Sequence, residues 1–242
     1  MPHLPRLIAF SFLLVSLSAS AQEPEKPLSD QLKEMTEGAK QRMPAEMLKT
    51  FGNAIDEVRE TGIEKTAKKV GDKAPDGTLL SWDEQKTTLS DLWKEKPLVL
   101  TWYRGGWCPY CNLQLRAMEK KLAELEGAGA RLVALTPELP ANAKETAAQN
   151  KLSFLVLHDK KNKLAHKYGI VFKLPESIVP VYRDRLQLPK VNGYDKLELP
   201  MAATYVIDRK GVIRYAFLDA DYKKRAEPAA IIEAVNKLAE DE

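Results

Sequence analysis

Cys108 and Cys111 are the only cysteines in the chain, and they stand three residues apart in the run Trp107-Cys108-Pro109-Tyr110-Cys111. Two thiols at this spacing in the first turn of a helix lie on the same side, within the range that a disulfide bond spans. A thiol at a helix N-terminus also has a lowered pKa, because unpaired N–H groups and the helix dipole stabilise the thiolate. The pattern predicts thiol–disulfide chemistry, with Cys108 as the nucleophile and Cys111 as the resolving thiol.

Three residues beside the pair are candidates for supporting roles. Pro109 suits the first helical position, since it needs no hydrogen-bond donor there and has the required φ. Arg104 either helps to hold the thiolate or is a solvated loop charge. Trp107 either belongs to the site or is a packing residue.

Two other uses of the cysteines are a metal site and a structural disulfide. A metal site needs two more ligands, and the chain has no further Cys; His158 and His166 lack ligand spacing and are expected to be surface or packing residues. A purely structural disulfide across three residues closes too small a loop to add much stability. Redox chemistry is therefore favoured, and it needs neither a metal nor an organic cofactor.

The N-terminus of the 242-residue chain has the pattern of an export signal. Arg6 is followed by an apolar core over 7–17 and by the small residues Ala19-Ser20-Ala21, so residues 1–21 are expected to be a signal peptide cleaved near Ala21. The mature chain is then periplasmic or extracellular, with no membrane span expected. A net charge of only +3 gives no electrostatic reason to expect a nucleic-acid partner.

Apolar periodicity predicts an α/β fold around the pair. A continuous apolar run over 98–103 has the character of a buried strand, and helical spacing follows Cys108 as far as Gly127. The further predicted elements are strands at 131–136 and 153–157, helices at 141–150 and 159–168, a hairpin at 204–218 and a helix at 227–239. This order predicts a mixed central sheet flanked by helices, with the cysteines at a strand-to-helix switch, where such sheets place their sites.

Two segments lie outside this alternation. Residues 22–69 are expected to be a helical extension, with helices at 30–42, capped by Ser29, and from Leu48 to Gly62. Residues 70–240 then form the main domain. Within it the proline-rich stretch 172–200 is expected to be an insertion packed over the sheet edge, with a short helix near 181–186.

The run from Tyr103 to Asn112, Tyr-Arg-Gly-Gly-Trp-Cys-Pro-Tyr-Cys-Asn, resembles the peroxiredoxin-like branch of the alkyl hydroperoxide reductase and thiol-specific antioxidant (AhpC/TSA) family. The similarity extends over about 28–238 and includes the stretches 70–76, 203–208, 219–222 and 225–228. The resemblance implies a thioredoxin-like fold, in which Cys108 matches the peroxidatic cysteine of peroxiredoxins.

Three positions depart from the pattern of that family. Typical peroxiredoxins have a Thr or Ser three residues before the peroxidatic cysteine and a Pro seven before, where this chain has Gly105 and Thr101. Before the late strand, where peroxiredoxins carry an arginine and disulfide reductases of this fold a cis-proline, the chain has Ala202. The usual residues for activating a peroxide and for docking a peptide are both absent, and Arg104 is a candidate to compensate for the first loss.

The resemblance thus favours a thiol-dependent peroxidase. A hydrogen peroxide or organic hydroperoxide substrate oxidises Cys108 to a sulfenic acid, Cys111 forms the disulfide, and a thioredoxin-like or other dithiol partner reduces it. The Cys-Pro-Tyr-Cys spacing keeps open a dithiol–disulfide oxidoreductase acting on protein disulfides. A third hypothesis is a partner-binding protein that uses the helical extension as its interface.

Overall fold

The computed structural model describes residues 26–240, so the predicted signal peptide lies outside the described residues. A seven-stranded mixed sheet forms the centre, in the order β2-β1-β5-β4-β3-β8-β9. Its strands are β1 (Thr78–Ser81), β2 (Lys86–Thr88), β3 (Leu98–Trp102), β4 (Arg131–Thr136), β5 (Leu155–His158), β8 (Thr204–Ile207) and β9 (Ile213–Phe217). Over the described range, no helix is long and apolar enough to cross a membrane.

Strand β3 is an interior strand of this sheet, parallel to β4 on one side and antiparallel to β8 on the other. All five of its residues are buried, because helices cover both faces of the sheet. Successive side chains point to opposite faces. Val99, together with Tyr103 just after the strand, belongs to one core cluster. Leu98, Leu100 and Trp102 belong to the other.

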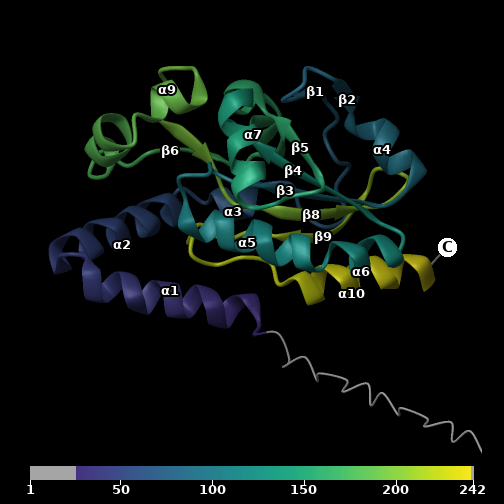
Figure 1. Cartoon of the computed structure of the whole chain (residues 1–242), viewed down its shortest axis with the longest axis horizontal. Coiled ribbons are helices and arrows are strands. Elements are labelled where there is room, and N and C mark those ends of the chain that lie inside the picture. Colours follow the sequence, from purple (N-terminus) through teal and green to yellow (C-terminus); the bar gives the residue numbers. More distant parts are fainter. Residues whose placement is uncertain (1–25, 241–242) are drawn as a thin grey trace, which may run out of the picture.

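Helices cover the two faces separately (Figure 1). The face that includes Val99 packs against α5 (Pro109–Lys120), α6 (Leu122–Gly127) and α10 (Pro228–Glu240). The opposite face packs against α3 (Ile63–Thr66), α4 (Leu89–Glu95) and α8 (Lys163–Tyr168). Helix α7 (Pro140–Gln149), which contacts β5, packs on the Val99 side through Ala143 and Ala147. The mixed sheet flanked by helices is as predicted.

The predicted N-terminal helices are present as α1 (Leu28–Arg42) and α2 (Ala45–Glu60). Helix α1 packs on α5 through the buried Leu28 and Leu32. The expectation that Ser29 caps α1 is wrong, since the helix already begins at Leu28. The Glu227 carboxylate accepts the backbone N–H groups of Leu28 and Ser29 at 3.2 and 2.5 Å, so a distant residue caps this helix.

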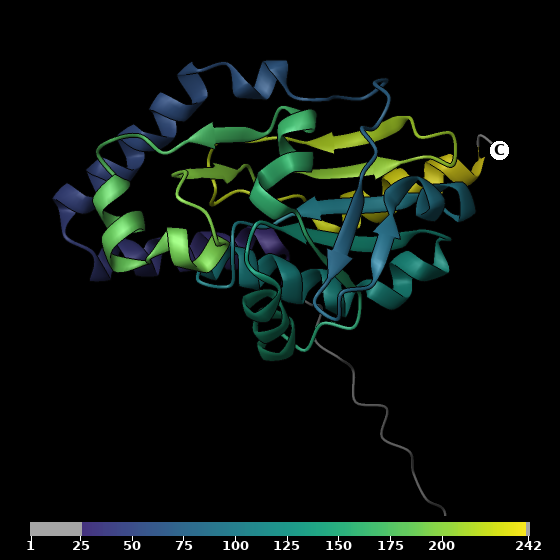
Figure 2. The same cartoon turned by 90° about the horizontal axis from the view of Figure 1, so that it is seen from above.

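The insertion at 172–200 is closed at its base by a small second sheet, β6 (Val171–Lys173) paired with β7 (Glu198–Pro200). Between them lie a turn of π-helix at Val181–Arg185, where a short helix was expected, and α9 (Leu188–Asn192). The insertion packs against α2 and Trp107 and not along an edge strand. Both views place it with α1 and α2 at the end of the molecule where α5 begins (Figure 2).

Two predicted helices differ in their bounds. The helix expected to run on to Gly127 divides at Lys121, whose ψ of 5° separates α5 from α6. The helix expected from 159 begins properly at Lys163, after a 3₁₀ turn, because the Asp159 carboxylate accepts the N–H groups of Leu164 and Ala165. The sequence pattern predicts none of the short strands β1, β2, β6 and β7.

Candidate active site

The cysteine motif occupies the predicted junction between strand and helix. Strand β3 ends at Trp102, and Cys108 is the residue immediately before α5, with Pro109 in the first turn of the helix. The predicted position of Cys108 at a helix N-terminus is thus confirmed. Both cysteines are reduced in this structure, and their side chains are 0% exposed.

Two glycines give the loop before Cys108 its shape. A Cβ at Gly105, whose φ is +152°, would lie 2.2 Å from Nε1 of Trp107. A Cβ at Gly106 would lie 2.0 Å from Oγ1 of Thr146. The Gly106 N–H donates to the buried Glu138 carboxylate at 2.9 Å, and Thr146 donates to the same group. Side chains on both sides of the loop therefore leave room only for glycine.

Cys108 is placed to be a thiolate. Arg104 Nη2 donates to its Sγ at 3.1 Å. Burial on its own would raise the pKa of the Cys108 thiol, but the hydrogen bond from Cys111 and the charges of Arg104 and Arg225 outweigh burial and hold the pKa well below the usual range. The helix N-terminus favours the same charge state.

Cys111 has the opposite tendency. Burial, together with the hydrogen bond to Cys108 and its negative charge, raises the pKa of the Cys111 thiol well above the usual range. The thiolate and the thiol therefore belong to different residues, Cys108 and Cys111 respectively. This is the assignment that the sequence predicted for the nucleophile and the resolving thiol, although the catalytic roles themselves stay predictions.

Arg104 is 3% exposed and part of the site. The alternative that it is a solvated loop charge is therefore wrong. Its guanidinium carbon lies 4.1 Å from the ring centre of Tyr222 and 5.2 Å from that of Trp107, and its Nη1 donates to the Tyr182 hydroxyl at 3.2 Å. Trp107 in turn meets Tyr182 edge to face. Aromatic rings thus hold the guanidinium against Cys108 Sγ.

Arg225 is a site residue that local sequence patterns do not single out. It lies between β9 and α10, is 5% exposed, and its Nη2 donates to Cys111 Sγ at 3.4 Å. Its Nη1 donates to the backbone carbonyls of Tyr222 and Lys224, which fix the guanidinium. Only its place in the family-like stretch 225–228 distinguished it in the sequence, and 114 residues separate it from Cys111.

The two guanidiniums are balanced by sulfur and not by carboxylate. Within residues 26–240, neither Arg104 nor Arg225 forms an ion pair with an acidic side chain. A buried cation without an anion is costly. A thiolate at Cys108 places a negative charge in contact with Arg104 and close enough to interact with the charge of Arg225.

Three further positions named in the sequence, Thr101, Ala202 and His166, form no hydrogen bond with either sulfur atom. Thr101 Oγ1 is 2.9 Å from Thr204 Oγ1, and Gln114 donates to both hydroxyls. Ala202 is buried before β8, and the described residues contain no cis peptide bond. His166 contacts Glu198 at 2.9 Å, a surface role as expected.

Comparison with known proteins places this geometry in a family. The model of the AhpC/TSA family matches residues 70–216. Peroxiredoxin Q from Triticum aestivum is 28% identical over 157 residues, 65% of this chain and 62% of that protein, and peroxiredoxin Q from Populus jackii is 27% identical over 168 residues, 69% and 66%. The matched stretch thus spans less than two thirds of either relative.

Solved structures agree on the fold. A peroxiredoxin-like protein from Aquifex aeolicus superimposes with a TM-score of 0.57 at 19% identity, covering 71% of this chain and 88% of the other. Peroxidoxin BcpB from Mycobacterium tuberculosis gives a TM-score of 0.54 at 18% identity, covering 70% and 97%. With its thioredoxin-like fold and a family match over more than half its length, the chain belongs to the AhpC/TSA family.

Proposed function

We propose that the protein is a thiol-dependent peroxidase in which Cys108 is the peroxidatic and Cys111 the resolving cysteine. The observation that carries the proposal is the Cys108 Sγ atom, held at a helix N-terminus and 3.1 Å from the buried Arg104 guanidinium. Membership of the AhpC/TSA family and the names of the relatives support the same activity.

The proposed reaction has two steps. The Cys108 thiolate attacks one oxygen of the hydroperoxide, so the O–O bond breaks, Cys108 becomes a sulfenic acid, and the other oxygen leaves as water or an alcohol after protonation. Cys111 then loses its proton and attacks Cys108 Sγ, which forms the disulfide and releases water. A thioredoxin-type or other dithiol reductant restores the two thiols.

Arg104 and Tyr182 are the groups proposed to orient the peroxide. The guanidinium carries donors already directed at Cys108 Sγ, and such donors stabilise the charge that develops on the leaving oxygen. In this proposal the Arg104 donors replace those of the arginine that typical peroxiredoxins carry at the position of Ala202. A crevice beside Arg104, between α2 and the insertion, has a volume of about 20 Å³, which is room for a water-sized molecule. This volume is too small for a bulky hydroperoxide.

Mixing the reduced protein with hydrogen peroxide in a stopped-flow instrument tests the proposal. We expect thiol loss at least about 100-fold faster than for free cysteine at pH 7, given the contribution that positioned donors make. A Cys111→Ser variant should accumulate a sulfenic acid on Cys108 that dimedone traps. Oxidation no faster than free cysteine would contradict the proposal.

A dithiol–disulfide oxidoreductase acting on protein disulfides is the second candidate, favoured by the Cys-Pro-Tyr-Cys spacing. A protein disulfide must reach Cys108 Sγ, which is 0% exposed and lies against the ring-flanked Arg104. The stopped-flow comparison therefore includes a protein disulfide as a second oxidant. The partner-binding hypothesis predicts instead that replacing both cysteines leaves the biological effect unchanged.

We also propose that the protein is exported and cleaved near Ala21, in view of the basic, apolar and small-residue regions of 1–21. N-terminal sequencing of the protein recovered from the producing cells tests this. A mature chain that still begins at Met1 would contradict it.

A further inference from the structure

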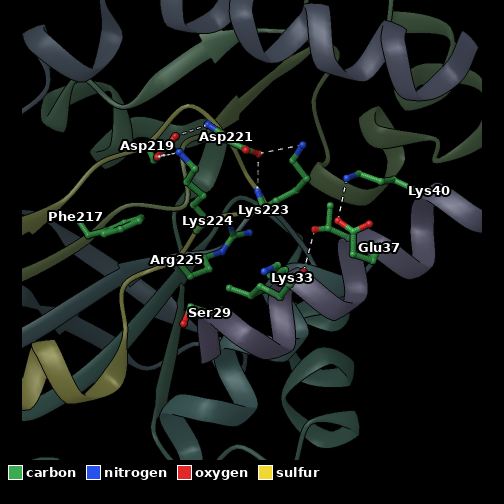
Figure 3. A pocket seen from close by; sticks show the side chains of 12 residues that line it. Ser29, Lys33, Glu37, Lys40, Phe217, Asp219, Asp221, Lys223, Lys224 and Arg225 are labelled. Carbon is green, nitrogen blue, oxygen red and sulfur yellow. Dashed lines mark hydrogen bonds and ion pairs between the residues drawn. The ribbon is translucent and has the colours of Figure 1, made fainter. Parts of the chain in front are cut away.

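A recess of about 480 Å³ lies between α1 and the loop 217–225 (Figure 3). This volume is in the range of small-ligand sites. One wall is the polar side of α1, including Lys33 and Lys40, and the other is the loop that carries Lys223 and Arg225. The recess is separate from the crevice beside Arg104, which lies between α2 and the insertion.

Positive charge exceeds negative charge in this recess. Five basic and three acidic residues line it, and the acidic ones are Glu37, Asp219 and Asp221. Each of these three pairs with a lysine of the recess, as the dashed lines in Figure 3 show. Lys33 and Arg225 form no ion pair with an acid in the described part of the chain. In the oxidised protein, which has no thiolate to balance Arg225, both cations therefore remain for an anionic ligand.

Arg225 connects the recess to the redox pair. The residue lines the recess, while its Nη2 donates to Cys111 Sγ at 3.4 Å. Its Nε atom is buried and has no hydrogen-bond partner. The redox pair thus has two distinct sides, with Arg104 next to Cys108 and Arg225 next to Cys111.

The chemistry of disulfide exchange distinguishes these sides. When a thiolate attacks a disulfide, the sulfur that is more stable as a thiolate leaves faster. Cys108 is that sulfur, because Arg104 and the start of α5 stabilise its charge. The reducing thiolate is then expected at Cys111, on the side where Arg225 and the recess lie. Cys111 is 0% exposed in the reduced protein, so this attack requires the Arg225 side chain to move aside.

We propose that the recess binds a small thiol that carries a carboxylate, and that the thiolate of this reductant attacks Cys111 Sγ of the oxidised pair. The proposal rests on the proposed function, because it concerns the disulfide that the peroxidase reaction forms. The carboxylate is held by Lys33 and the neighbouring cations of the recess, and the incoming thiolate is drawn to the Arg225 guanidinium.

The step is balanced as follows. The reductant sulfur forms a bond to Cys111 Sγ, the Sγ–Sγ bond breaks, and Cys108 leaves as the thiolate held by Arg104. A second thiolate attacks the reductant sulfur of the mixed disulfide, which releases the oxidised reductant and the Cys111 thiolate. Cys111 takes up a proton from water. Two thiols are oxidised to one disulfide while the protein disulfide is reduced to a thiolate and a thiol.

The test begins with protein whose disulfide has been formed by diamide, so that it does not depend on peroxidase activity. Mercaptoacetate and the neutral 2-mercaptoethanol are the two reductants, at low ionic strength. We expect Lys33→Glu to lower the rate constant for mercaptoacetate about 3- to 10-fold, as steering by exposed charges allows, and that for 2-mercaptoethanol less than about 2-fold. Lys86→Glu, on exposed β2, is the matched control and should change neither.

Acid quenching during the reaction, followed by alkylation and peptide mass analysis, locates the mixed disulfide. We expect mercaptoacetate on Cys111 and a free Cys108. Mercaptoacetate found on Cys108, an unchanged rate in Lys33→Glu, or equal losses for the two reductants would each overturn the proposal. Slow oxidation by peroxide would instead contradict the proposed peroxidase activity and leave these measurements interpretable.

Discussion

At the scale of single residues, the site consists of two sulfur atoms, each with its own buried guanidinium. Arg104 donates to Cys108 and Arg225 to Cys111, yet the two thiols differ in charge state. Two features distinguish Cys108, namely its place at the start of α5 and the shorter contact, 3.1 Å against 3.4 Å. A helix N-terminus and a nearby cation both favour a thiolate, so Cys108 is the residue that ionises.

Replacing Arg104 by Gln tests this assignment. Loss of the adjacent charge should raise the pKa of the Cys108 thiol toward the ordinary thiol value of about 8.5. Thiolate absorbance at 240 nm against pH measures it, and the rate with peroxide near pH 7 should fall by at least about tenfold, since one pKa unit corresponds to that factor. Arg104→Lys keeps the charge and should retain more of the low pKa. An unchanged titration in Arg104→Gln would show that the helix terminus alone is sufficient.

The glycines before Cys108 give a second prediction at this scale. Gly105→Ala places a Cβ against Trp107 and should lower the free energy of unfolding by about 1–3 kcal/mol, as overpacking does. Gly52→Ala is the control, because nothing lies within 4 Å of its Cβ position and it is inside α2. There alanine should stabilise by about 1 kcal/mol. Urea unfolding measures both, and equal effects would contradict the steric explanation.

At the scale of elements, α1 is part of the enclosure of the redox pair. Leu28 and Leu32 belong to the same core cluster as Cys108 and Cys111, and Thr36 Oγ1 lies 3.2 Å from the Tyr110 hydroxyl. Helix α1 thus packs on the helix that carries Cys111, although it lies outside the 70–216 match to the family, and we expect burial of the cysteines to depend on it.

Leu32→Ala should weaken the packing of α1. Removing a buried leucine side chain costs about 2–5 kcal/mol, and here we expect the loss as local opening of α1. Alkylation of the reduced protein by iodoacetamide should then accelerate about tenfold or more, since each 1.4 kcal/mol is a factor of ten. Gln41→Ala, on an exposed position of the same helix, should leave the rate unchanged. Equal rates in the two variants would mean that α1 does not control access.

Elements with strong apolar periodicity were predictable from the sequence, and those fixed by distant contacts were not. The strand over 98–103 and the helix after Cys108 follow from local patterns. The start of α1 depends on Glu227, and the short strands β1 and β6 depend on pairing partners. Arg225 is likewise invisible to local reasoning, because its partner Cys111 is 114 residues away. Local sequence patterns therefore identify the cysteines and the neighbouring Arg104, but not Arg225, the second guanidinium beside the sulfur atoms.

At the scale of the whole molecule, the redox state changes the charge balance of the interior. The reduced protein holds one thiolate among two buried guanidiniums, whereas the disulfide form has no negative charge at the sulfur atoms. Reduced and oxidised proteins therefore bind protons differently on unfolding, and their stabilities must depend differently on pH.

The sign follows from the two cysteines. The pKa of Cys108 is lowered in the folded protein, so the folded state holds one proton fewer than the unfolded state between that pKa and the unfolded value of about 8.5. Stability of the reduced protein rises with pH across this window, by up to about 1.4 kcal/mol per pH unit. Cys111 has a raised pKa, so above about pH 8.5 the folded state retains a proton that the unfolded state has lost, and stability declines.

We therefore expect the difference in unfolding free energy between reduced and oxidised protein to pass through a maximum near pH 8.5, the unfolded thiol pKa. Urea titrations from pH 5 to 10, with and without a phosphine reductant, measure this difference. The other titrating groups are common to both forms, and those distant from the sulfur atoms cancel, which makes the oxidised protein the control. A difference that stays flat from pH 5 to 8 would mean that Cys108 is a neutral thiol in the folded protein. In that case Arg104 and Arg225 would lack an anion, and the basis for a nucleophilic Cys108 would be lost.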